Sequence, residues 1–174
     1  MALSQLIAPG PDFRRFFHTF EHTAFRLEVR DWYDAPYENE SLRKFLAGEP
    51  DDLEWSNGWL QLVREGRAEG RTFSRVRVVS VPLTDYSRFG LWASQFTVEA
   101  GEDIRYVARD RATGLPNHDY WMFDSRTVVR MHFDDESVFL GGELIGDPAD
   151  VVQHNYWRDA AWHIAVRREN FAPE

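Results

Sequence analysis

Apolar and charged residues alternate along several segments of the chain from residue 72 onward, as in a β-strand with two different faces. Clear examples are Arg75-Val76-Arg77-Val78 and Ile104-Arg105-Tyr106. The connections at residues 124–126 and 134–136 have hairpin length, so the last three strands should form an antiparallel meander. The pattern predicts strands at residues 72–81, 103–109, 120–123, 127–133 and 137–145.

The N-terminal third of the chain mixes the two periods. Residues 13–20 carry four phenylalanines at helical spacing, whereas Phe25, Leu27 and Val29 alternate with charged residues as a half-buried strand would. Short helices are expected at residues 41–46, before Gly48, and at 56–63.

Two longer helices are marked by residues typical of helix ends. Thr84 and Asp85 can cap a helix that Gly101 closes, and it carries Phe89, Trp92 and Phe96 on one side. Asp147-Pro148 supplies an N-cap and a first-turn proline for a final helix over residues 148–168.

This order of elements predicts an α+β fold. We expect a mostly antiparallel sheet with a C-terminal three-strand meander, covered by helices on one side. With 174 residues, 43% hydrophobic, the chain can fill one core, so residues 1–174 are interpreted as a single domain.

Composition narrows the function classes. The net charge of −9 argues against nucleic acid and anionic membranes as partners. The chain has no cysteine, which rules out disulfides and thiolate metal sites. No segment approaches the roughly 18 apolar residues of a membrane span, and the N-terminal stretch lacks a basic region. We therefore expect a cytoplasmic protein without a membrane partner.

Arginine dominates the basic residues, since only Lys44 among the 20 is a lysine. If Val76, Ile104 and Met131 share one core in a single antiparallel sheet, a row of basic side chains occupies the opposite face. Like charges across a ladder repel by about 1 kcal/mol per pair or less. Internal carboxylates such as Glu28 and Glu143, a bound anion or an acidic partner protein must neutralise them. The candidate ligand-binding residues are Arg75, Arg77, Arg105, Arg109, Arg130 and His132, with Trp121 and Tyr156 as aromatic residues able to stack on a ring.

Other motifs favour structural interpretations. His18-Thr-Phe-Glu-His22 matches an inverted zinc-protease pattern, but it lies beside the aromatic stripe, and the helix-to-strand change near His22 would separate the histidines. A third ligand is not evident, so we predict neither a metal nor another cofactor. Four carboxylates flank the strands and could hold Mg²⁺ or act in acid/base chemistry; we favour ion pairs with neighbouring arginines, or turn capping, for Glu102, Asp103, Asp119 and Asp124.

Several stretches resemble a known family. Residues 75–86, which read RVRVVSVPLTDY, are followed by AGEDIRY at 100–106, Leu115-Pro116 and DYWMFD at 119–124. Together with AFRLE at 24–28, FLAG at 45–48 and Arg158-Asp159, they resemble an uncharacterised actinobacterial family of small proteins. The resemblance spans nearly the whole chain and implies a gene neighbourhood with helix-turn-helix regulators. It implies no activity, catalytic residue or cofactor.

Two function classes follow. The leading hypothesis is a non-enzymatic accessory or regulatory protein that binds a small anionic ligand or a partner protein, such as a neighbouring helix-turn-helix regulator, through the arginine-rich face. The alternative is a small enzyme, nuclease-like or a phosphate-substrate hydrolase or transferase, acting on a nucleotide or nucleic acid. In that case His132 is the histidine expected on the arginine face to transfer protons.

Overall fold

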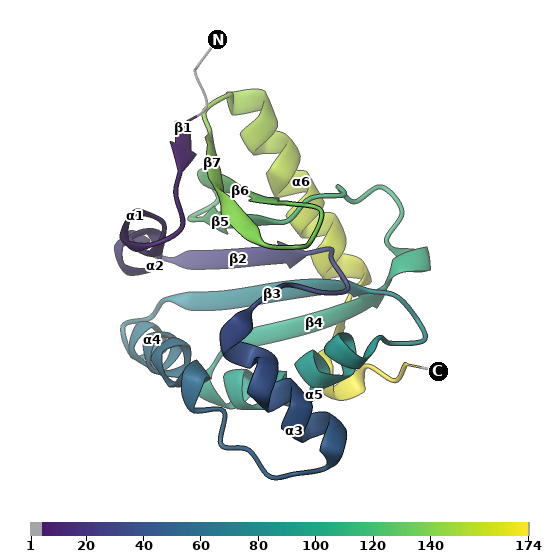
Figure 1. Ribbon diagram of the computed structural model, residues 1–174. Helices are drawn as coiled ribbons and strands as arrows, with labels where there is room; N and C mark the ends of the chain where they lie inside the picture. The colour runs from purple at the N-terminus through teal and green to yellow at the C-terminus, as the bar shows by residue number, and fades with distance from the viewer. Residues whose placement is uncertain (1–4, 174) are drawn as a thin grey trace.

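The computed structural model describes residues 5–173, and an eight-stranded sheet lies at its centre (Figure 1). The strand order across the sheet is β1-β7-β6-β5-β2-β3-β4-β8. The strands are β1 (Gln5–Ile7), β2 (Thr23–Glu28), β3 (Thr72–Val79), β4 (Asp103–Ala108), β5 (Tyr120–Phe123), β6 (Thr127–Phe133), β7 (Phe139–Ile145) and β8 (Val166–Arg167).

The helices begin and end close to their sequence signals. The side chain of Thr84 accepts a hydrogen bond from the backbone of Ser87, and Gly101 ends the same helix in the left-handed conformation. Asp147 caps the last helix as expected, but the expected end at residue 168 is wrong: the helix ends at Ile164, because the next residues extend to form β8. The helices are α1 (Pro11–Arg14), α2 (Phe16–Thr19), α3 (Asn39–Ala47), α4 (Asn57–Ala68), α5 (Asp85–Ala100) and α6 (Pro148–Ile164), with short 3-10 turns η1 (Pro36–Glu38), η2 (Glu54–Ser56), η3 (Arg109–Arg111) and η4 (Arg168–Asn170).

The mixed α+β fold and the C-terminal meander are confirmed. Strands β5, β6 and β7 pair antiparallel in sequence order, and β5 pairs antiparallel with β2. The expectation that residues 72–145 are antiparallel throughout is wrong, because β2, β3 and β4 are parallel to one another. Parallel neighbours need a crossover, and α5 supplies it between β3 and β4.

Helices cover both faces of the sheet. The α5 face packs Phe73, Trp121 and Met131 against α1, α2 and α4, and Ile104 against α5. The α6 face packs Val76 and its neighbours against α6. Figure 1 shows α3 in front of the sheet and α6 behind it. The expectation of helices on one side was therefore incomplete.

The central strand β2 is buried on both faces. Leu27 is fully buried on the α6 face, and Glu28, on the other face, is only 5% exposed. The prediction of a half-buried strand at this position is wrong, because β2 lies between β5 and β3 in the middle of the sheet. Its charged residues are consequently enclosed in the protein, where charges require partners.

No helix within residues 5–173 has both the length and the apolar character needed to cross a membrane.

Candidate functional site

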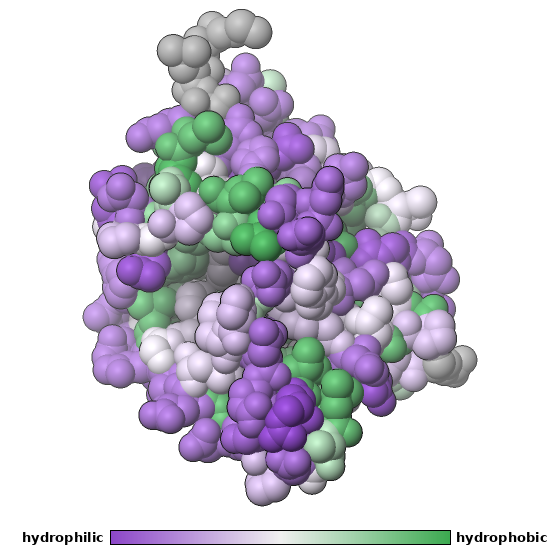
Figure 2. Space-filling view, viewed as in Figure 1, coloured by the Kyte–Doolittle hydropathy of each residue, from purple (hydrophilic) through white to green (hydrophobic). Residues whose placement is uncertain are grey.

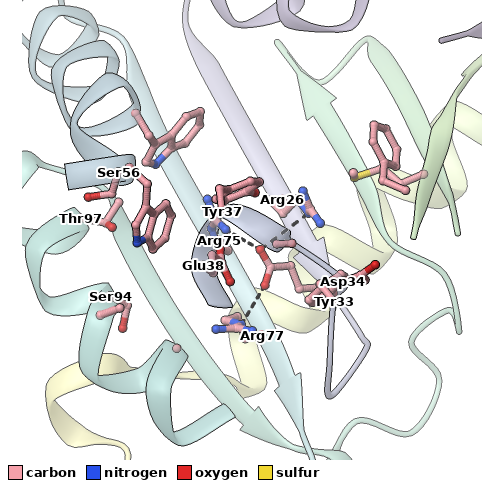
Figure 3. Close-up of a pocket in the computed structure, with 18 of the residues that line it drawn as sticks. Arg26, Tyr33, Asp34, Tyr37, Glu38, Ser56, Arg75, Arg77, Ser94 and Thr97 are labelled. Atoms are coloured by element: carbon pink, nitrogen blue, oxygen red, sulfur yellow. Dashed lines mark hydrogen bonds and ion pairs between the residues drawn. The ribbon is translucent and has the colours of Figure 1, made fainter. Parts of the chain in front are cut away.

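Four charged side chains of β2 and β3 meet on the α5 face of the sheet. The parallel register places Arg26 beside Arg75 and Glu28 beside Arg77. The carboxylate of Glu28 is the common partner of the three arginines. It accepts a hydrogen bond from Arg75. Its oxygens lie 2.8 Å from Nε of Arg77 and 3.8 Å from Nε of Arg26. Figure 3 shows the three arginines close together on the floor of a cavity in the protein. Alternation within each strand thus gathers three guanidinium groups around one carboxylate.

Two further carboxylates flank this group. Asp119, just before β5, accepts hydrogen bonds from Arg26 (3.1 Å) and from the Tyr33 hydroxyl (2.6 Å). Glu102, just after α5, accepts hydrogen bonds from Nε of Arg75 (2.8 Å) and from the Trp59 indole (3.0 Å). Both acids are almost fully buried. The prediction that Glu102 and Asp119 pair with neighbouring arginines is confirmed. Within each pair, the carboxylate neutralises the charge of the arginine.

The environment shifts the pKa values of three groups near the cavity. Burial alone would raise the pKa of Glu28, but the charges of Arg75, Arg77 and Arg26 outweigh it and lower this pKa to about 2. Burial, together with nearby acids, holds the pKa of Tyr33 well above its usual value. Burial also raises the pKa of Glu38, although it accepts a hydrogen bond from Tyr86.

A cavity of about 750 Å³ lies over this ion-pair network. Its floor contains Arg26, Glu28, Arg75 and Arg77, and Figure 2 shows a hollow on this side of the molecule. The walls are rich in aromatic residues, with hydroxyl groups from α5. The wall residues include Tyr37 and Glu38 of η1, Trp55 of η2, Trp59 of α4, and Gly90, Ala93, Ser94 and Thr97 of α5.

Gly90 explains how α5 approaches the arginines. A Cβ atom at this position would lie 2.2 Å from a terminal nitrogen of Arg77. Glycine in the middle of a helix costs about 1 kcal/mol relative to alanine, so a packing reason is expected. Here the missing side chain leaves room for the Arg77 guanidinium between the sheet and the helix.

Of the predicted site residues, the structure brings together Arg75, Arg77 and Trp121. Both arginines and Trp121 lie on the α5 face, and the Arg75 guanidinium is 5.7 Å from the Trp121 ring centre. Arg105 points to the other face, because the register pairs Arg75 with Ile104 and Val76 with Arg105. Its guanidinium stacks 3.7 Å from the ring centre of Trp162. The prediction of one continuous arginine row is therefore wrong.

The remaining candidates also lie away from the cavity. Arg109 follows β4 and pairs with Asp31 at 3.1 Å. Arg130 and His132 alternate with the buried Met131 of the α5 face, so they point toward the α6 face; His132 lies 2.9 Å from Glu143. Tyr156, on α6, is 63% exposed. The expectation that His132 shares a face with Arg75 and Arg77 is wrong, because residues of β6 with even numbers face α6.

A histidine pair that the sequence analysis did not single out lies on the α6 face. Nε2 of His118 is 3.1 Å from Nε2 of His154, and Nδ1 of His154 is 2.7 Å from the Asp150 carbonyl oxygen, to which it must donate. Burial and the charge of Arg130 lower the pKa of His118 to about 4. By contrast, α2 ends at Thr19, so His18 and His22 do not share a helix. Within residues 5–173, no group of three or more His, Cys, Asp or Glu side chains could hold a metal ion.

The sequence analysis missed Arg26 and Tyr33 as parts of the site, and it named Glu28 only as a neutralising acid. The available signal was the alternation of Arg26 and Glu28 with Phe25 and Leu27. It was interpreted as an exposed face, because a single sequence does not show that β2 is central.

The fold and the cavity define a mixed α+β domain with an internal charged site. A family model for a domain of unknown function (DUF6879) matches residues 11–173, so the chain belongs to that family. This confirms the family resemblance, whereas the actinobacterial origin and the gene neighbourhood stay predictions. A comparison with curated protein sequences finds no match.

A comparison with solved structures gives matches at low sequence identity. Nuc from Salmonella typhimurium, a phospholipase D family member, is 10% identical, with a TM-score of 0.58 over 95% of this chain and 97% of that one. TrmBL2, an archaeal chromatin protein, is 11% identical (TM-score 0.48; 89% of this chain and 49% of that one). Phosphatidylserine synthase from Haemophilus influenzae is 10% identical (TM-score 0.45; 95% and 39%). The first likeness shows a shared fold and nothing more.

Proposed function

We propose that this protein is a non-enzymatic accessory or regulatory protein that binds a small anionic ligand in the cavity on the α5 face. The observation that carries the proposal is the cavity itself: about 750 Å³ of space above three arginines, of which Arg77 is buried and the other two are partly buried, with aromatic walls. This volume lies within the range of small-molecule sites, which combine apolar walls with a few placed polar groups. The regulatory role rests on the gene neighbourhood that the family resemblance implies.

The protonation states of the floor support binding over proton transfer. A general acid or base works best with a pKa near the working pH. Glu28, with a pKa of about 2, stays ionised at neutral pH, and the arginines stay charged. These groups can hold and orient a ligand without exchanging protons with it.

The second candidate is an enzyme acting on a phosphorylated substrate, and the histidine pair favours it. The lowered pKa of His118 keeps its imidazole neutral at pH 7, as a nucleophile must be, and Arg130 lies near it. The fold shared with a phospholipase D family member adds weak support. If this activity exists, His118→Gln should reduce hydrolysis of bis(p-nitrophenyl) phosphate about a hundredfold or more, whereas Tyr156→Phe should not.

Thermal unfolding with a panel of small anions tests the binding function. The panel contains benzoate, indole-3-acetate, phenyl phosphate, citrate and AMP. Filling the cavity with Ala93→Phe, on α5, should abolish the rise in melting temperature that a ligand causes; Val152→Phe, which places the same phenyl ring at a 69% exposed position of α6, should keep it. A ligand at about 100 times its Kd adds roughly 2.7 kcal/mol of stability. The proposal fails if no panel member stabilises the wild type, or if the stabilisation survives in Ala93→Phe.

A further inference from the structure

The floor network of the cavity consists of three arginines and three carboxylates: Arg26, Arg75, Arg77, Glu28, Glu102 and Asp119. Its charges are balanced in number but not in position. Arg26 has Asp119 as a partner of its own, and Arg75 has Glu102. Among the described residues, Arg77 has Glu28 as its one carboxylate partner within 4 Å, and Glu28 is shared with the other two arginines. Arg77 is therefore the arginine whose charge is neutralised least.

Arg77 is also placed to reach a ligand. It lines the cavity, and its terminal nitrogens lie against Gly90 on α5. Its side chain is 10% exposed and lines the cavity, so a nearly enclosed cation borders the open space. A charge-assisted hydrogen bond in such a site is stronger than one formed at the protein surface.

The other cavity groups limit the ligand to a single negative charge. Three arginines face three carboxylates in the floor network; Asp34 and Glu38 also line the cavity, and Arg14 adds a cation at an exposed position. The acids of the network and the lining therefore outnumber the arginines by five to four, and a second or third charge on a ligand would lie near these acids. Like charges at short range in a partly dry site repel strongly.

Aromatic side chains provide the rest of the contact surface. Tyr37 and Trp55 lie with their ring centres 5.4 Å apart, and Trp59 lines the cavity with its ring centre 5.8 Å from that of Trp121. The indole nitrogens of Trp55 and Trp59 already donate to Ser41 and Glu102. These residues can therefore offer apolar surface to a ring without leaving a buried donor unpaired.

We infer that the ligand of this cavity is a monoanionic molecule with an aromatic body, its anionic group bound at Arg77 and its ring against Tyr37, Trp55 and Trp59. This inference rests on the proposed binding function and specifies the chemical class of the ligand. It excludes polyphosphates and polycarboxylates as ligands of this site.

A pair of fluorescent probes separates the charge from the ring. 1-Anilinonaphthalene-8-sulfonate (ANS) carries one sulfonate, and N-phenyl-1-naphthylamine has the same ring system without a charge. The wild-type protein should bind ANS about tenfold more tightly or better, as one charge-assisted hydrogen bond implies. Arg77→Gln should remove this preference and leave binding of the neutral probe unchanged. Arg126→Gln, an equal charge change in an exposed turn, should leave both affinities unchanged.

The wild-type comparison keeps the test decisive if Arg77→Gln does not fold. Equal affinities for the two probes would overturn the monoanion class, as would an ANS preference that persists in a folded Arg77→Gln protein. Displacement of ANS by inorganic tripolyphosphate would overturn it too. In these cases the proposed binding function stands if the anion panel still stabilises the wild type and not Ala93→Phe. Failure of that panel experiment defeats the binding function itself.

Discussion

Replacing Glu28 with glutamine tests whether the ion-pair network holds the sheet together. The carboxylate is 5% exposed and lies among three guanidinium groups. Glutamine keeps the shape of the side chain but removes its charge. Arg26 and Arg75 would keep Asp119 and Glu102, whereas Arg77 would lose its carboxylate partner among the described residues. The variant should therefore be destabilised through orphaned buried charge rather than through lost packing.

Two independent arguments give the size of the effect. Removing one partner of a buried ion pair costs about 3–5 kcal/mol. The pKa of Glu28 falls from 4.5 to about 2, which corresponds to roughly 3 kcal/mol of stability at neutral pH. A domain of this kind has about 5–15 kcal/mol of stability, so the variant should still fold.

Urea unfolding between pH 2 and pH 7 measures this loss and its origin. Because its pKa is lowered in the folded state, Glu28 contributes its full stability above the unfolded value of 4.5 and loses it as the pH falls toward about 2. The stability difference between the wild type and Glu28→Gln should shrink over that window. Glu40→Gln, which disrupts an exposed pair with Arg43, is the matched control and should change stability little. A loss below about 1 kcal/mol at pH 7, or a difference that does not change with pH, would refute the reasoning.

Three further predictions concern other positions. Gly142→Ala should destabilise the protein by about 1–3 kcal/mol in urea unfolding, because the new Cβ would lie 2.5 Å from Val129; an unchanged midpoint would contradict this packing. In an NMR titration, the ring of His118 should stay neutral down to a pH of about 4, since burial lowers its pKa; titration near 6.5 would show that this ring is not enclosed. Gly90→Ala should weaken ANS binding by displacing Arg77, while a better helix propensity offsets part of the strain; ANS affinity equal to wild type would argue against Arg77 as the anion site.

The candidate site was only partly accessible from the sequence. Arg75 and Arg77 were found because their strand alternates strongly with valine, and Glu102 and Asp119 because they flank strands. Arg26 and Glu28 show the same alternation, but their strand was interpreted as having one exposed face. The difference lies in the position of a strand within the sheet, which depends on contacts between residues far apart in the chain.

Local signals in the sequence by themselves determined most elements and the meander. A continuous apolar run marks β5 and alternation marks β6, at the ends that the strands have in the structure, and Gly48, Gly101 and Asp147 mark helix ends, because backbone preferences act over a few residues. Only the tertiary structure decided which strands are neighbours and which faces their side chains share. Side chains on paired strands share a face only in the actual register, and a shift of one residue moves each to the other side. The parallel register of β3 and β4 thus sends Arg105 to α6 while Arg75 and Arg77 remain in the cavity.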